Sequence, residues 1–156
     1  MDTLLKKLAL ATSLAAVLSC VIGVRAAITE KTLSQHRTTF LDRVIEDNPD
    51  YESRIRMVMK GVILEGRKGI SLLDKFGLFL GNMEKKGIDI SMIRFYGRED
   101  RFCLFFVMKD RKDDQPYTMF LEYDFGPGGK CALRNIYFSI VFEERMNEIK
   151  AFFETR

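Results

Sequence analysis

Two carboxylates, Glu122 and Asp124, come nearest in this sequence to a catalytic or metal-binding pair. In an extended strand, residues two apart share one face and lie about 6.5–7 Å from each other, close enough to divide acid and base work or to hold a hard cation. The alternative is a solvated sheet face on which Arg134 or a lysine neutralises both charges across the strand ladder. We expect the ion-paired face. An enzyme using these carboxylates or Tyr123 stays open as a second interpretation.

The other chemically versatile residues are few. His36 is the only histidine, and one imidazole cannot assemble the usual zinc set or a catalytic triad without distant partners. Cys103 and Cys131 fall on predicted strands about 9–10 Å apart, beyond the roughly 7 Å that a disulfide tolerates. We therefore expect two buried thiols, no metal site, no cofactor and no assigned catalytic residue.

A glycine-rich segment, 126–130, has the sequence Gly-Pro-Gly-Gly-Lys. A phosphate-binding loop of the Walker type needs Ser or Thr after its lysine, followed by a helix. Here Cys131 and a predicted strand follow, so the segment is interpreted as a hairpin loop.

Three helices are predicted in the first half of the domain. Residues 38–47 carry one apolar stripe, and Asn48-Pro49 is typical of a cap followed by a first helical residue. The helix that begins there has apolar residues at helical spacing, namely Ile55, Val58, Met59, Val62 and Ile63. Gly66 and Gly69 bracket a basic turn. A third helix covers residues 71–86 and ends at Gly87.

The second half changes to strand periodicity. Candidate strands cover residues 91–96, 102–109, 117–125 and 131–141, and their short connections favour an antiparallel meander. Met119, Leu121 and Tyr123 are assigned to the core face of the third strand; Ala132, Ile136 and Phe138 to that of the fourth. The strand 102–109 is apolar on both faces and is placed inside the sheet. A final helix is predicted over residues 142–154, with its apolar stripe at Phe142, Met146, Ile149 and Phe153.

Helices followed by a curled antiparallel sheet make an α+β domain. This architecture resembles the cystatin-like and nuclear-transport-factor-like rolls over about 100 residues, without a sequence motif that they share. Such rolls host binding modules and enzymes alike, so the resemblance implies a fold and no function. We expect Phe105, Leu121 and Phe138 to lie in one core with Val58 and Phe76.

Gly77 and Gly81 form a stripe of small residues on the third helix. They either admit a neighbouring element at close range or form one wall of an apolar pocket whose other wall is the aromatic sheet, with Phe76 and Tyr123 as lining residues.

The first 26 residues have a different role. A basic opening, a charge-free run from Leu8 to Val24 and the sequence Val24-Arg25-Ala26 indicate a secretory signal peptide. Cys20 in Leu18-Ser19-Cys20 makes a lipoprotein the second interpretation, and an uncleaved membrane anchor is the third. Residues 27–37 are predicted to be a tether, and residues 38–156 a single domain.

The charge balance excludes a basic nucleic-acid-binding surface. The chain has 25 basic and 22 acidic residues, and without Asp2, Lys6, Lys7 and Arg25 the balance is 22 to 21. Contact with a membrane is expected only through the N-terminal segment. We therefore expect an exported, non-catalytic protein of the periplasm or cell envelope that binds a protein partner or a small apolar ligand. A structural accessory of an envelope assembly remains the third interpretation.

The leader interpretation predicts that exported protein begins at Ala27, because peptidase cleavage follows the small residue at Ala26. Intact-mass measurement of exported material checks this directly. A mass that begins at a lipid-modified Cys20 would support the lipoprotein, and the mass of the whole chain would support the anchor.

Overall fold

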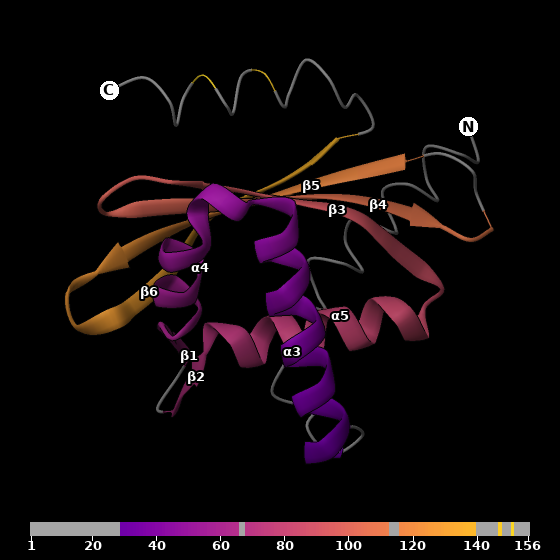
Figure 1. Cartoon of the computed structure of the whole chain (residues 1–156), viewed down its shortest axis with the longest axis horizontal. Coiled ribbons are helices and arrows are strands. Elements are labelled where there is room, and N and C mark those ends of the chain that lie inside the picture. Colours follow the sequence, from indigo (N-terminus) through magenta and orange to yellow (C-terminus); the bar gives the residue numbers. More distant parts are fainter. Residues whose placement is uncertain (1–28, 66–67, 113–115, 140–146, 148–150, 152–156) are drawn as a thin grey trace.

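The computed structural model of this protein describes residues 29–65, 68–112 and 116–139, together with Asn147 and Ala151. Its helices lie on one side of the main strands of a curled sheet (Figure 1). The α+β roll expected from the sequence is confirmed at this level. The predicted leader, residues 1–26, lies outside the described residues, as does the predicted final helix over 142–154 apart from Asn147 and Ala151. None of the helices in the described part is long and apolar enough to cross a membrane.

The first described helix, α3 (Glu30–Asp47), is longer than predicted. Thr29 caps it, since its hydroxyl accepts a hydrogen bond from the backbone N–H of Thr32 at 3.2 Å. Leu33 is buried on the same face as Phe40 and Val44. The tether prediction for residues 27–37 is therefore wrong from Glu30 onward. Leu33 stands seven residues before Phe40, so the core stripe begins two turns earlier than we assigned it.

The second predicted helix is split into a helix and a strand. A short 3₁₀ turn, η2 (Pro49–Tyr51), leads into α4 (Glu52–Met59), and β1 (Val62–Glu65) follows. Val62 and Ile63 thus belong to a strand, although their spacing continued the helical stripe. Gly61 makes the change possible, because the chain passes very close to the neighbouring strand at this point. A Cβ on residue 61 would lie 2.4 Å from the Sγ of Cys131, so only glycine fits there without displacing that side chain. β1 forms a hairpin with β2 (Lys68–Ser71), so the predicted basic turn connects two strands.

The third helix is confirmed. α5 covers Leu72–Lys85, and the hydroxyl of Ser71 caps it by accepting a hydrogen bond from the N–H of Asp74 at 3.0 Å. Gly87 follows the helix with φ of +72°, a conformation that L side chains rarely adopt. All the predicted inward residues are buried or packed against the core, namely Leu72, Leu73, Phe76, Phe79, Leu80 and Met83.

The predicted meander is confirmed and extended. β3 (Ile88–Gly97), β4 (Arg101–Asp110), β5 (Pro116–Gly126) and β6 (Lys130–Ser139) are antiparallel neighbours. The glycine-rich segment turns between β5 and β6 through η3 (Pro127–Gly129), as a hairpin loop should. The full sheet has the order β2-β1-β6-β5-β4-β3, and β1 runs parallel to β6, which makes the six-stranded sheet mixed.

The two faces of the sheet carry different sets of side chains. The inner face packs on the helices, and Met119, Leu121 and Tyr123 lie there as predicted. We call the other side the outer face; a smaller buried cluster lies on it, formed by Cys103, Phe105, Val107 and Phe120. The prediction that Phe105 shares a core with Val58 and Phe76 is therefore wrong. β4 is apolar on both faces and therefore contributes residues to both clusters.

A bulge in β6 overturns one further assignment. Glu122 pairs with Asn135 and Tyr123 with Leu133, so Arg134 is an extra residue in the ladder. The shift brings Leu133 to the inner face and leaves Ala132 exposed opposite Asp124. Ile136 and Phe138 pack against the core as expected.

The end of α3 is bonded to the sheet edge at β3. Asn48 is buried, and its amide donates to the carbonyl oxygens of Val44 and Ile93, both at 2.8 Å, and accepts from the N–H of Phe95 at 3.0 Å. A carboxylate oxygen of Asp47 accepts from the N–H of Ile93 at 2.6 Å. These two side chains satisfy backbone groups of an edge strand that would otherwise lack partners. Asn48 does not cap the next helix by a side-chain bond.

We predict that Asn48→Ala lowers the free energy of unfolding by about 2–4 kcal/mol, because it leaves the buried N–H of Phe95 and the carbonyl of Ile93 without a partner. Urea unfolding followed by circular dichroism measures the change. Asn82→Ala is the matched control, since Asn82 is half-buried on α5 and the structure describes no hydrogen bond of its side chain. An effect of similar size in both variants would contradict the role given to Asn48.

Candidate functional site

The space between α5 and the inner face of the sheet is filled by aromatic rings. Phe76 of α5 stacks on Phe40 of α3 with ring centroids 4.7 Å apart and planes 1° apart. On the sheet, Tyr123 stacks on Phe102 at 5.1 Å, and Phe76 meets Tyr123 edge-on at 6.1 Å. All four rings are fully buried. Phe76 and Tyr123, proposed from the sequence as ligand-lining residues, are thus packed against each other in the core.

The two glycines of α5 face α3 rather than the sheet. A Cβ at Gly77 would lie 2.9 Å from the Cγ and 3.2 Å from the backbone N of Arg37, and one at Gly81 would lie 2.9 Å from two imidazole atoms of His36. Of the two alternatives for this stripe, the structure therefore has close packing of a neighbouring helix. The glycines do not open a space between α5 and the aromatic sheet.

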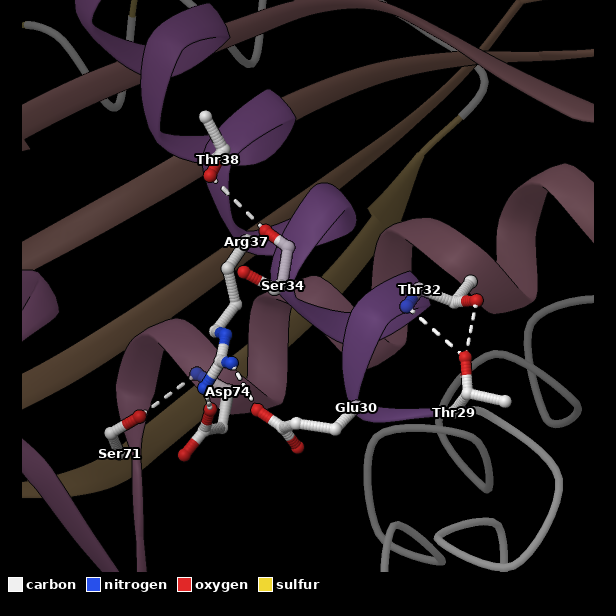
Figure 2. A network of polar contacts seen from close by, with 8 residues as sticks. All are labelled: Thr29, Glu30, Thr32, Ser34, Arg37, Thr38, Ser71 and Asp74. Atoms are coloured by element: carbon white, nitrogen blue, oxygen red, sulfur yellow. Dashed lines mark hydrogen bonds and ion pairs between the residues drawn. The ribbon is translucent and has the colours of Figure 1, made fainter.

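An ion-paired cluster stabilises the same helix crossing (Figure 2). Arg37 donates to the carboxylate of Asp74 at 2.7 Å and to that of Glu30. Asp74 is itself held by the helix cap, because its backbone N–H donates to the hydroxyl of Ser71. Burial lowers the pKa of Arg37, and its hydrogen bonds to Asp74 and Glu30 more than offset this, so that the pKa is raised. Figure 2 shows Arg37 reaching from α3 to the first turn of α5. The cluster joins two helices and has the character of a structural clamp.

The carboxylate pair lies on the outer face and is matched by cations. Arg101 lies 3.3 Å from Glu122 and 3.6 Å from Asp124, and Arg134 lies 3.3 Å from Asp124. Asn135 also donates to Glu122 at 2.6 Å. The face is ion-paired, as expected, and Arg134 does neutralise Asp124, but Glu122 is buried rather than solvated and its cation is Arg101 of β4. The two carboxylates point away from the helices, and neither lies on the inner face of the sheet.

His36 and the two thiols lie apart, in separate packed environments. His36 lies on α3, mostly buried against Gly81, with its Nδ1 3.7 Å from a carboxylate oxygen of Glu84. Both cysteines are free and buried, as predicted, and they occupy opposite faces of the sheet. Burial raises the pKa of Cys131 to about 11, and burial together with the nearby Glu122 raises the pKa of Cys103 well above its ordinary value. Over residues 29–139, within the described ranges, no group of three metal-ligating side chains comes together.

The β1–β2 hairpin, at the edge of the sheet opposite β3, has an exposed apolar surface. Leu64 is 58% exposed and Val62 is 38% exposed, and both side chains project on the outer face, while Ile63 between them enters the core. Gly69 of β2 lets them lie flat, since a Cβ there would be 2.4 Å from Val62 and 3.3 Å from Leu64. We call Val62, Leu64 and the strand β2 the apolar edge.

The two edges of the sheet differ in how they are protected. Asp47 and Asn48 bond to the backbone of β3. Among the described residues, β2 has a strand on only one side and receives no comparable side-chain bond. Our sequence interpretation missed this edge because Val62 and Ile63 continued a helical stripe. The available signal was the short apolar run Val62-Ile63-Leu64, bounded by Gly61 and Gly66, which is typical of a buried strand.

Comparisons with known proteins assign no function. No family model matches this chain, and no curated protein sequence matches it. Among solved structures, it is similar to a candidate ketosteroid isomerase from Shewanella frigidimarina, with 16% identity over 66% of this chain and 94% of that one and a TM-score of 0.30. A variant named Rd1NTF2 is 15% identical over 65% and 91% of the two chains, with a TM-score of 0.29. A protein from Catenulispora acidiphila is 10% identical over 76% and 94%, with a TM-score of 0.24.

We predict that Gly77→Ala destabilises the protein by about 1–3 kcal/mol, although alanine is the better helix former, because the new methyl group meets the backbone of α3. Gly81→Ala should cost less, since the atoms within reach belong to the imidazole of His36, which can turn away. Thermal unfolding of both variants measures the difference. If Gly77→Ala raised the melting temperature, the close contact between α3 and α5 would be refuted.

Proposed function

We propose that this chain is an exported, non-catalytic binding protein that recognises a protein partner through its apolar edge. The observation that carries the proposal is the contrast between the two sheet edges. One edge is bonded to Asp47 and Asn48, whereas the other presents an open strand beside exposed Val62 and Leu64. Natural proteins usually protect or charge such edges, and an apolar open edge is typical of a surface that pairs with another chain.

The mode of recognition that fits this edge is strand addition. In that mode, backbone hydrogen bonds to the open strand supply affinity, and side-chain contacts on one face supply specificity. Leu64 is the most exposed large apolar residue at the edge and would be the central contact. Tyr137 is also 47% exposed and lies on the same outer face, on β6, which neighbours β1. A partner strand beside β2 would extend the sheet and shield the aliphatic side chains from water.

The other two functions considered from the sequence have less support. A small apolar ligand between the helices and the inner face would have to displace the packed rings of Phe40, Phe76 and Tyr123. An enzyme using Glu122 and Asp124 would have to work on the outer face, with both carboxylates held by Arg101. A place in an envelope assembly is compatible with the proposal, because the partner would then be a component of that assembly.

We predict that a photo-crosslinking residue in place of Val62 captures one discrete protein in intact cells, and that adding Leu64→Asp abolishes this adduct. Met57→Asp is the matched control, since Met57 is 43% exposed but belongs to α4 and not to the apolar edge. Mass spectrometry identifies the adduct, and circular dichroism confirms that each variant is folded. An adduct that survives Leu64→Asp would contradict the proposal, and an adduct with a second copy of this chain would replace the partner by self-association.

A further inference from the structure

A groove of about 410 Å³ lies at the other end of the sheet, where α3, the end of α5 and the start of β3 meet. The sheet order separates it from the apolar edge by the whole width of the sheet. Its lining residues are Arg43, Leu80, Glu84, Ile88, Asp89, Ile90 and Arg111. The volume falls within the range of about 300–1,000 Å³ that is usual for small-molecule sites.

The floor of the groove is aliphatic. Leu80, Ile88 and Ile90 line it, and each is no more than 5% exposed. Gly87, with its positive φ, turns the chain from α5 directly into β3, and this turn brings Leu80 beside the two isoleucines. The part of the floor that is exposed is therefore small and aliphatic, and it includes no hydrogen-bonding side chain.

Most of the charges at the rim are already engaged. Arg111 binds Asp89 through three contacts between 2.8 and 3.2 Å, and this hydrogen bonding lowers the pKa of Asp89. Glu84 lies 3.7 Å from His36 and is half exposed. Arg43 is different. It is half-buried, and among the described residues it makes no hydrogen bond and no ion pair within 4 Å, although its charge acts on Asp89 and helps to lower the pKa of that carboxyl.

We propose that this groove binds a small monocarboxylate with an aliphatic body, whose carboxylate is held by Arg43 and whose hydrocarbon part lies on Leu80, Ile88 and Ile90. A planar guanidinium can donate two parallel hydrogen bonds to a carboxylate, which is the strongest contact available here. Glu84 and Asp89 stand at the same rim, so a doubly charged group such as phosphate would meet more repulsion than a single carboxylate. This site is independent of the apolar edge, and its failure would leave the partner proposal untouched.

Isothermal titration of the intact chain with octanoate, octanol and acetate tests the proposal. We expect octanoate to bind, and both octanol and acetate to bind at least about tenfold more weakly, because each lacks one half of the recognition. Equal binding of octanol would overturn the role of Arg43, and equal binding of acetate would overturn the role of the aliphatic floor. Absence of octanoate binding would overturn the whole proposal.

Two variants and a control locate the site. Arg43→Gln should weaken octanoate binding by about tenfold or more, whereas Arg56→Gln, on the exposed side of α4 and paired with Glu52, should leave it unchanged. Glu84→Gln should tighten binding several-fold, since it removes a negative charge from the rim. Retained melting temperatures show that the variants are folded. Unchanged binding in Arg43→Gln, or weaker binding in Glu84→Gln, would refute the assignment of the carboxylate to Arg43.

Discussion

The close crossing of α3 over α5 is the contact on which the rest of this structure depends. Gly77 and Gly81 lack side chains on the face that α3 covers, and this lets Phe40 stack directly on Phe76. From Phe76 the ring contacts continue to Phe106 and Tyr123 on the sheet. Because aromatic rings bury large areas and pack in definite geometries, this chain of contacts fixes the distance between helices and sheet. It also fills the interior in which a roll could otherwise hold a ligand.

The position of α3 in turn decides which edge of the sheet is closed. At the end of α3, Asp47 and Asn48 reach the backbone of β3 and satisfy groups that an edge strand would leave exposed. Among the described residues, β2 receives no equivalent bond from a side chain to its backbone, although α5 begins directly after it. The asymmetry of the sheet therefore follows from the packing of a single helix. It leaves the exposed aliphatic side chains of β1 beside the open strand.

Polar residues on this domain are mostly engaged in holding it together. Arg37 joins α3 to α5 through Asp74, and Arg101 is matched to Glu122 and Asp124 on the outer face. Such pairs contribute modestly at the surface, but a buried carboxylate such as Glu122 needs its partners because an uncompensated buried charge is costly. In each of these cases, a charged residue that could serve in catalysis has a structural role instead. Arg43 is the contrasting case, since it lines a groove, acts on Asp89 only at longer range and makes no hydrogen bond or ion pair with any described residue.

The amino-acid sequence by itself determined the class of the domain and most of its elements. The helical stripe of α5, the four alternating strands and the hairpin at Gly126–Gly129 are local patterns, and local periodicity is sufficient to predict them. Sequence reasoning also placed Glu122 and Asp124 on the face opposite Tyr123. It failed for Val62 and Ile63, because their helical spacing was outweighed by pairing with β6 and by the close contact of Gly61 with Cys131.

Only the tertiary structure decided the features that bear on function. Which element covers Gly77 and Gly81, which edge Asn48 protects and which side of the sheet holds Phe105 all depend on residues distant in sequence. The groove around Arg43 likewise combines three elements whose meeting is not encoded in any one segment. Periodicity specifies which residues share a face, but the neighbour of that face is set by long-range packing, and surfaces that bind other molecules are made there.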